Sequence, residues 1–349
     1  MQMNSPGKSR YIIVMSILAA MLLVLLAACT MLGSVSIDAA SILSIITGKG
    51  CDNQAWEVII LHSRLPMIAT ALLAGAALSV SGLLLQTTFN NPLAGPSILG
   101  VSTGAGLGVA IVMLAMGGTV GGIFGETIGS YFATLLGAFA GAGIVLFILI
   151  AFSAIVKSGT MLLIIGILVS YLASSVISLL NSLATESSIS NYVAWGLGTF
   201  SNVSVSQLPV YSCLIIVSLI GSSLMVKPLN ALLMGTRYAE NMGVNVKHTR
   251  NTLLLITGVL TAVVTAFCGP IGFIGLVVPH IARLITGTSN HRRLIPATII
   301  TGADITLLCT LLSSLGPNGV IPINAITPII GVPIILYVII NRRKIQYFN

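Results

Sequence analysis

The feature that most constrains this chain is its series of long apolar runs, which only short polar stretches separate. Roughly ten runs are long enough, or nearly so, to cross about 30 Å of hydrocarbon as helices. The predicted spans are residues 11–33, 65–86, 97–116, 128–155, 160–181, 207–226, 251–268, 271–286, 294–315 and 320–341. With 56% hydrophobic and 6% charged residues among 349, the chain cannot fold as a water-soluble globule. The sequence predicts an all-α integral membrane protein, because a closed barrel would show alternating polar residues.

Basic side chains fall almost wholly on one side of the predicted spans. Cytoplasmic loops hold an excess of Lys and Arg, so this side is assigned to the cytoplasm, together with both chain termini. It carries Lys8, Arg10, Lys157, Lys227, Arg237, Lys247, Arg250, Arg283, Arg292, Arg293, Arg342, Arg343 and Lys344. The other side carries Lys49, Arg64, Asp38, Asp52, Glu57, Glu126 and Glu186. The formal charge of +8 therefore reflects topology and lipid contact, and no nucleic-acid partner is expected.

Residues that could carry enzyme chemistry are scarce. The sequence has no GxxxxGK[ST] phosphate loop, its histidines lack metal-ligand spacing, and no span carries facing carboxylates. We therefore expect no enzyme, no metal site and no cofactor. Uphill transport would need an ion gradient or a separate ATPase subunit. Asp304 is the one convincing ionisable residue within a span, and this scarcity disfavours the ion-coupled route.

The longest polar stretch on the predicted cytoplasmic side covers residues 227–251. Its apolar residues gather before Gly235 and again before Gly243, a pattern that predicts two short helices with a glycine between them. Such helices are too short to span. A solvated connecting loop is the simpler interpretation. The functional interpretation is a coupling element that inserts into a cleft of a cytoplasmic partner.

Three blocks of sequence resemble the permease subunits of type II ABC importers for iron–siderophores, haem and vitamin B12. Residues 64–108 contain RLPM, GAALSVSGLLLQ and NPLAGPSILGVSTGA, similar to the family's RLPR, GAxLaxSGxxxQ and NPLAxPxxLGxxxGA. Residues 232–246, LLMGTRYAENMGVNV, resemble its coupling segment. Residues 269–303 contain GPIGFIGLVVPHIAR, similar to its GxIxFVGLxxPHxxR block. The three blocks follow the family's order and are spread over most of the chain.

The resemblance implies one permease domain over residues 1–349, similar to vitamin B12 importer permeases, with coupling helices at residues 227–250. It implies two cytoplasmic ATPase subunits, an external substrate-binding protein and a second permease copy or paralogue, all at a bacterial plasma membrane. The implied ATPase-coupling residues are Met234, Gly235, Thr236, Ala239, Glu240 and Gly243. The pathway and gate candidates are Asn91, Pro92, Gly100, Gly104, Lys157, Ser158, Gly159 and Thr160. Arg64 and Lys49 are the candidates for docking the binding protein.

Four places depart from the family's pattern. One is residues 320–324, VIPIN, where the family has Glu-Leu-Pro-Val-Gly at the opening of the last helix. Met67 replaces the second Arg of RLPR, Thr310 stands where an Asp is usual in the ninth helix, and Ser314 stands where an Arg is usual. In relatives, external Arg residues of this kind pair with acids on the binding protein, so Arg64 is left as the obvious partner here. The simpler interpretation of Arg64 is a side chain that reaches out to lipid headgroups.

The segment between the second and third predicted spans cannot be helical throughout. Pro92 and Pro96 stop a helix from running through it, and non-helical backbone at this depth requires surrounding protein or a water-filled cavity. Gly100, Gly104 and Gly108 then recur every fourth residue and leave one helix face bare for close packing.

A short internal echo favours an inverted repeat. Residues 95–101, GPSILGV, resemble residues 269–277, GPIGFIGLV, and the two stretches follow spans of opposite predicted direction. Together with the resemblance, this predicts an ATP-driven importer that works by alternating access and translocates an iron–siderophore, or else haem or cobalamin. The alternatives are an ion-coupled secondary transporter that uses Asp304, and a non-transporting membrane scaffold.

Overall fold

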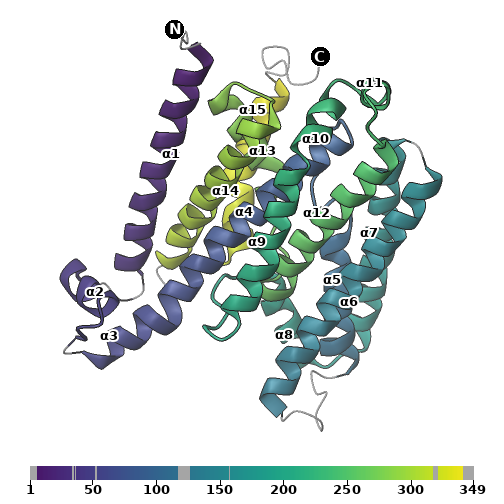
Figure 1. Cartoon of the computed structure of the whole chain (residues 1–349). Coiled ribbons are helices and arrows are strands. Elements are labelled where there is room, and N and C mark those ends of the chain that lie inside the picture. Colours follow the sequence, from purple (N-terminus) through teal and green to yellow (C-terminus); the bar gives the residue numbers. More distant parts are fainter. Residues whose placement is uncertain are drawn as a thin grey trace.

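The computed structural model describes residues 6–33, 35, 37–51, 53–116, 126–156, 158–316 and 321–340, and all secondary structure in these ranges is helical (Figure 1). The elements are α1 (Pro6–Met31), α2 (Ala39–Ile46), α3 (Gln54–Val58), η1 (Ile59–Arg64), α4 (Leu65–Thr88), α5 (Val101–Ala110), η2 (Ile111–Ala115), α6 (Glu126–Ile155), α7 (Gly159–Leu183), α8 (Glu186–Gly196), α9 (Leu208–Leu224), α10 (Val226–Leu233), α11 (Thr236–Asn241), α12 (Val246–Cys268), α13 (Ile274–Thr286), α14 (His291–Ser314) and α15 (Ile323–Ile340). The two η elements are π-helical segments that continue an α-helix.

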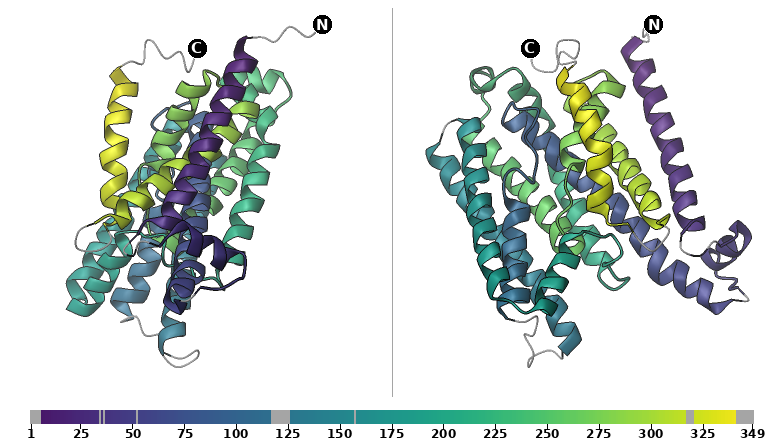
Figure 2. Two further views of the ribbon diagram at one scale, coloured as in Figure 1. Left: turned by 90° about the vertical axis from the view of Figure 1, so that its left-hand side faces the viewer. Right: turned by 180° about the vertical axis from the view of Figure 1, so that it is seen from behind.

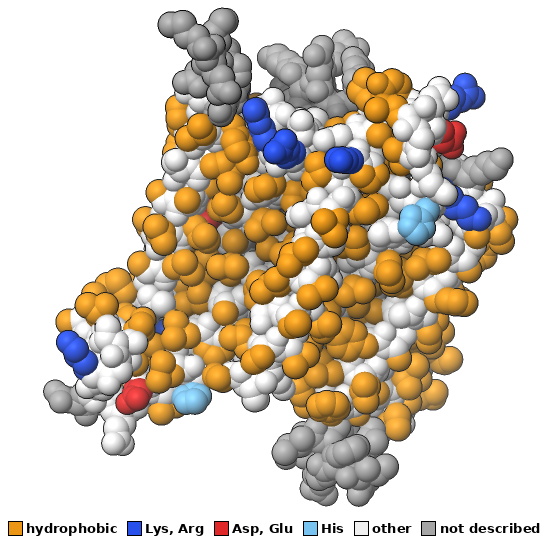
Figure 3. Space-filling model, in the orientation of Figure 1, with side chains coloured by type: hydrophobic (Ala, Val, Ile, Leu, Met, Phe, Trp, Pro, Cys, Tyr) orange, Lys and Arg blue, Asp and Glu red, His pale blue; other side chains and the backbone are white. Residues whose placement is uncertain are grey.

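The long helices lie side by side between two ends of the molecule (Figures 1 and 2). One end, called here the α10 end, holds α10, α11, the start of α1 and the close of α15. The opposite end, called the α2 end, holds α2, α3 and α8. On the face that Figure 3 shows, Lys and Arg side chains gather at the α10 end, and hydrophobic side chains cover the middle. This separation of charge follows the pattern expected of a membrane protein.

Each predicted span overlaps a helix in the described residues, although residues 97–100 and 271–273, predicted as parts of spans, are not helical. Six helices are long and apolar enough to cross a membrane: Ser9–Met31, Gln54–Thr88, Tyr131–Ile155, Gly159–Leu183, Val246–Cys268 and His291–Ser314. The pair α9 and α10 qualifies only together, with a bend of 54° between them. The remaining predicted spans match shorter apolar helices, namely α5 with η2, α13 and α15. The described residues thus hold six or seven crossings by length, and the total of about ten stays a prediction.

The central helix of the fold runs without interruption from Gln54 to Thr88 through α3, η1 and α4. It starts well before the predicted span at residues 65–86, because Asn53 caps it and its first turns carry the charged residues Glu57 and Arg64. The Asn53 side-chain oxygen accepts a hydrogen bond of 3.0 Å from the Ala55 amide. Most of α4 is buried, and α9, α12, α13 and α14 pack around it.

Glycines bring α4 into backbone contact with its neighbours. Gly75 faces Gly302 of α14, and Gly82 faces Gly275 of α13. A Cβ atom at Gly275 would lie 2.7 Å from the Leu78 carbonyl oxygen, which is too close for any side chain. Helices that approach this closely make dispersion contacts directly between their backbone atoms. The three helices therefore form one tightly packed unit.

The close-packing face predicted for residues 100–108 is confirmed for two of its glycines. Gly104 meets Gly141 and Gly108 meets Gly137, so α5 and α6 touch along their backbones. Gly100 has a different role: it has φ +81° and forms the turn that begins α5.

The two stretches of the predicted internal repeat occupy comparable places in the fold. Residues 95–101 lead into α5 and residues 269–277 lead into α13, and both helices are short. Gly106 of α5 lies near Tyr192 of α8 at the α2 end, whereas Arg283, late in α13, bonds Gln86 at the α10 end of α4. The two helices thus run in opposite directions, as an inverted repeat requires, and the repeat itself stays a prediction.

Candidate functional site

A hollow of about 630 Å³ opens on the face formed by α5, α7, α8, the segment before α13, and α15. Its polar lining consists chiefly of Ser102, Thr103, Ser174, Ser178, Tyr192, Trp195 and Asn324. This lining is uncharged, and its donors and acceptors are hydroxyl, indole and amide groups. Among the described residues no three His, Cys, Asp or Glu side chains gather to hold a metal ion. The hollow therefore combines a few uncharged hydrogen-bonding groups with apolar and aromatic surface.

On the side of the hollow that α7 forms, the polar lining residues are serines at helical spacing. Ser174 and Ser178 lie one turn apart, and the Ser178 hydroxyl donates a 3.0 Å hydrogen bond to the Ser174 carbonyl oxygen. The wall from α8 depends on Tyr192 and Trp195, whose rings stack with centroids 6.1 Å apart. Thr185 caps α8 and so fixes the start of this aromatic wall. One helix thus presents small hydroxyls, and the other presents large flat rings.

Asn324 ties three elements together at the α2 end of the hollow. Its side-chain amide donates to the Gly196 carbonyl oxygen at 3.0 Å and also to the Pro270 carbonyl oxygen. Its side-chain oxygen accepts from the Gly272 amide at 3.3 Å. The neighbouring Phe273 has φ +66°, a left-handed conformation that is strained for a residue with a side chain. The backbone before α13 is therefore held in a special shape where it lines the hollow.

At the α10 end, one gate candidate at the start of α7 packs against the end of α4. Gly159, at the start of α7, lies so close to Phe89, which ends α4, that a Cβ atom would be 3.1 Å from the Phe89 ring. Asn91 accepts a 2.9 Å hydrogen bond from the Leu93 amide, which shapes the connection at residues 90–96. Ser158 caps α7. The gating role of these residues stays a prediction.

The remaining pathway candidates lie where the structure gives less support for a role in the transport path. Thr160 is exposed at the start of α7, and Lys157 lies outside the described residues. Gly100 lies against Ser170 of α7, and Gly104 is buried in the contact with α6 rather than in the hollow. The packing of Gly104 gives its predicted role in the pathway no support. Sequence reasoning overlooked the serines of α7, although their spacing at residues 170, 174 and 178 is visible in the chain.

The two short helices predicted before and after Gly235 are present as α10 and α11. Gly235 has φ +101° and turns the chain between them. Leu229, Leu232 and Ala239 anchor the pair by burial. The exposed residues of the pair and of the turn after it include Met234, Thr236, Arg237, Tyr238, Glu240, Asn241, Met242 and Gly243. Large apolar side chains are unusual on the polar end of a membrane protein and mark a contact surface, but the coupling role stays a prediction.

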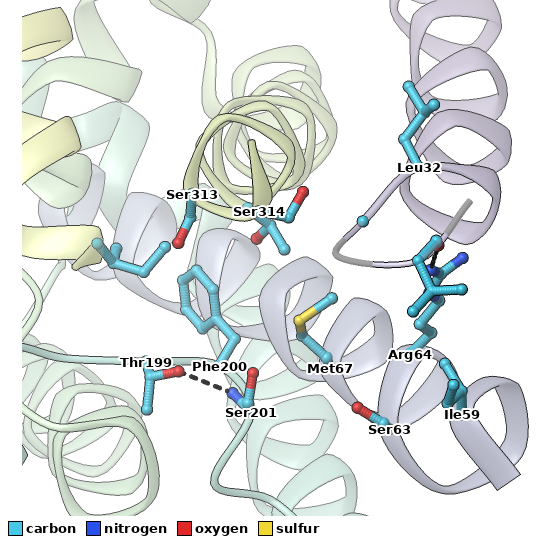
Figure 4. A pocket seen from close by; sticks show the side chains of 14 residues that line it. Leu32, Ile59, Ser63, Arg64, Met67, Thr199, Phe200, Ser201, Ser313 and Ser314 are labelled. Atoms are coloured by element: carbon cyan, nitrogen blue, oxygen red, sulfur yellow. Dashed lines mark hydrogen bonds between the residues drawn. The ribbon is translucent and has the colours of Figure 1, made fainter. Parts of the chain in front are cut away.

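A second cavity, of about 280 Å³, lies at the α2 end between α1, η1, α4 and α14 (Figure 4). Met67, Thr310 and Ser314, three of the departures from the family's pattern, all line it. The cavity thus gathers three positions where the resemblance implies charged residues, whereas the fourth such position, Val320, lies outside the described residues. Their replacement by uncharged residues changes this outer cavity as a unit.

Arg64 also lines this cavity, but its guanidinium is turned toward the chain that follows α1. It donates to the carbonyl oxygens of Thr30 at 2.6 Å and Met31 at 3.2 Å, and to that of Val35. With 5% of its surface exposed, it acts as a cap on the end of α1. Lys49, by contrast, is exposed after α2. Docking by either residue stays a prediction, and Lys49 is the accessible one.

Asp304 lies within α14 and has no exposed surface. Neither carboxyl oxygen has a hydrogen-bond partner within the described part of the chain. Ion-coupled carriers place ionisable groups within the membrane in this way, so Asp304 is the residue whose substitution distinguishes the two energy sources.

Comparisons with known proteins agree with this geometry. The FecCD transport family matches residues 13–341. The vitamin B12 import system permease protein BtuC of Citrobacter koseri is 34% identical over 290 residues, which cover 82% of this chain and 84% of that one. The protein of the same name from Salmonella paratyphi A is also 34% identical, over 82% of this chain and 85% of its own.

A solved structure described as a metal-chelate type ABC transporter in an inward-facing conformation has a chain that superposes on this one with a TM-score of 0.79. The two are 28% identical, and the match covers 95% of this chain and 99% of the other. The family match spans nearly the whole sequence, and the structural match spans nearly the whole fold. The chain therefore belongs to the FecCD transport family.

Proposed function

We propose that this chain imports a metal chelate, with an iron–siderophore as the first candidate and haem or cobalamin as the others. Membership of the FecCD family makes it the multi-pass membrane subunit of an ABC importer, and ATP hydrolysis belongs to a separate subunit. Such a permease works with an ATPase, a binding protein and a second permease subunit, at the bacterial inner membrane. In this arrangement the α10 end would face the cytoplasm and the α2 end the binding protein.

The observation that carries the proposal is the uncharged hollow bounded by α5, α7, α8 and α15. A siderophore complex wraps its metal in organic ligands, so the transport path needs only hydroxyl and aromatic groups that interact weakly with its surface. The lining offers such groups, and the described residues offer no cluster that would strip the metal from its chelator. A second permease copy that faces this hollow would enlarge it, and that is the expected role of the dimer.

The test is uptake by the complex of permease, ATPase and binding protein in proteoliposomes, with a ferric hydroxamate, haem and cobalamin offered separately. We expect ATP-driven uptake of the ferric hydroxamate. Ser178→Trp should block it by filling the hollow. Ser175→Trp is the matched control, because Ser175 lies on the same helix but does not line the hollow. Uptake of cobalamin alone would overturn the choice of substrate, and equal uptake by both variants would overturn the assignment of the path.

A further inference from the structure

A chain of side-chain hydrogen bonds joins three helices at the α10 end. Asn230 of α10 accepts hydrogen bonds from the backbone amide of His291 at 2.9 Å and from its ring Nδ1 at 3.0 Å. The other ring nitrogen of His291, Nε2, lies 2.9 Å from the Thr87 hydroxyl oxygen of α4. His291 has no exposed surface, and Thr87 is 3% exposed. The imidazole therefore bridges α10 and α4 from the first turn of α14.

The chemistry of the three groups gives each bond a direction. The amide oxygen of Asn230 can only accept, so the His291 Nδ1 atom carries the proton in that contact. A neutral imidazole then offers Nε2 as an acceptor. The Thr87 hydroxyl shares its one proton between this Nε2 and the Leu83 carbonyl oxygen of its own helix, which lies 3.0 Å away. A change at either end of the link thus leaves a buried polar atom of His291 without its partner.

The neighbouring residue of α4 extends the link toward the connection at residues 90–96. The Gln86 side-chain oxygen accepts a hydrogen bond of 2.6 Å from the Arg283 guanidinium, and its amide group donates to the Leu276 carbonyl oxygen at 3.1 Å. His280, one turn before Arg283, lies with Nε2 2.8 Å from the Pro92 carbonyl oxygen and donates to it. Two adjacent residues of α4 thereby connect α10 on one side with α13 and Pro92 on the other.

Burial makes this arrangement sensitive to movement. Gln86, His280 and Arg283 are no more than 2% exposed. Apolar side chains can slide past each other with little loss, whereas a buried hydrogen bond is lost when its atoms separate by about 1 Å. If α10 moves, α14 and α4 have to move with it, or His291 loses its bonds. The backbone contacts of α4 with α13 and α14 carry such a movement onward.

We propose that Asn230, His291 and Thr87 are positioning residues that couple movement of α10 to the connection at residues 90–96. The proposal rests on the proposed function, in which an ATPase displaces α10 and α11. The ATPase would pull or release α10, the link would carry the displacement to the end of α4, and Gln86 with α13 would pass it to Pro92. Asn91, next to Pro92, would then open or close the inner mouth of the path.

Thr87 and Thr88 provide a matched pair of substitutions for the test. Both hydroxyls bond a carbonyl oxygen of their own helix, Thr88 that of Leu84 at 2.7 Å and Thr87 that of Leu83 at 3.0 Å. The Thr87 hydroxyl also reaches His291 of another helix, so the pair differs by this one contact between helices. Thr→Val keeps the side-chain shape and removes the hydroxyl in both cases. The measurement is the number of ATP molecules hydrolysed per ferric hydroxamate taken up by the complete complex in proteoliposomes. Loss of one buried hydrogen bond predicts a rise of about fivefold in this ratio for Thr87→Val.

Thr88→Val should keep the wild-type ratio, and Thr87→Ser, which restores the hydroxyl, should return close to it. Asn230→Leu should raise the ratio as Thr87→Val does, and the double variant should be no worse than either, because both break one link. Asn230 is only half-buried, so this variant carries the test if Thr87→Val does not assemble. Equal ratios in Thr87→Val and Thr88→Val, or an unchanged ratio in Asn230→Leu, would overturn the proposal. Absence of ATP-driven uptake by the wild-type complex would instead overturn the proposed function.

Discussion

At the scale of single residues, Arg64 and Asp38 show how the α2 end is held in place. Arg64 closes the end of α1 by binding carbonyl oxygens that have no helical partner. Asp38 starts α2, and its carboxylate accepts a 3.0 Å hydrogen bond from the Ser41 amide. Both residues fix helix ends at this end of the molecule.

Replacing Arg64 with Met should lower the melting temperature of the purified permease by several degrees. Hydrogen bonds to a charged group contribute about 1.5–3 kcal/mol each, and the carbonyl groups at the end of α1 would lose theirs. Lys49→Met is the control, because Lys49 is exposed and should leave the melting temperature unchanged. Scanning fluorimetry in detergent gives the measurement. An unchanged melting temperature for Arg64→Met, with slower association of the binding protein, would assign Arg64 to docking instead.

Asp38 makes the stability of α2 depend on pH. The hydrogen bonds from Ser41, first through its side chain and then through its backbone, hold the pKa of Asp38 below its ordinary value of 3.8. A lowered pKa in the folded state stabilises α2 above pH 3.8, and the effect disappears as the pH falls through the lowered value. Asp38→Asn keeps a cap that does not titrate. Hydrogen exchange of residues 39–46 should therefore accelerate in acid relative to this variant, and parallel pH profiles would contradict the assignment.

At the scale of elements, the pair α10 and α11 is the best-defined candidate for contact with an ATPase. Its inner surface is anchored by buried leucines, and its outer surface carries Met234, Tyr238 and Met242. These three side chains are 47–65% exposed, which is unusual for large apolar groups at a polar end of a membrane protein.

Glu240→Lys should abolish stimulated ATP hydrolysis by the assembled complex while the permease stays folded, because Glu240 is exposed on α11. Reversal of a charge at a packed contact typically costs several kcal/mol. Gly235→Trp should have the same effect but is less clean, because φ +101° at this position strains any residue with a Cβ atom. Lys247→Glu on the neighbouring helix α12 serves as a control. Wild-type coupling in Glu240→Lys would remove α11 from the contact.

The sequence predicted the helices well in segments where one property, such as a continuous apolar run or a single glycine between two helices, determines the local structure. The apolar runs predicted the long helices, and Gly235 predicted the break between α10 and α11. The start of the central helix at Gln54 was missed, because its early turns mix Trp56 with Glu57 and lack a continuous apolar run. The hollow was missed as well. It depends on which faces of α7 and α8 meet in space, and a linear pattern does not give that information.

At the scale of the whole molecule, a single substitution at Asp304 can test whether ATP or an ion gradient drives transport. The family assigns hydrolysis to a separate ATPase, and Asp304, an acid in the middle of α14, is fully buried. Its carboxyl oxygens have no hydrogen-bond partner within the described chain.

Asp304→Asn should therefore leave uptake close to wild type when ATP is present and the proton gradient is collapsed. A neutral amide keeps the shape of the side chain and removes its proton chemistry. The measurement is substrate accumulation in proteoliposomes with an ionophore, compared between wild type and variant. Uptake that needs the gradient and disappears in Asp304→Asn would favour an ion-coupled carrier.

The uninterrupted helix from Gln54 to Thr88 has a consequence for the lipids around the protein. Its 35 residues make it about 52 Å long at about 1.5 Å per residue, well beyond the thickness of a hydrocarbon core. The helix must tilt or extend into the headgroups, and the balance between the two depends on acyl-chain length. Because α13 and α14 are locked to it by glycine contacts, its tilt is shared by the core of the fold. Bilayer thickness thus becomes a variable that sets the resting position of the α2 end.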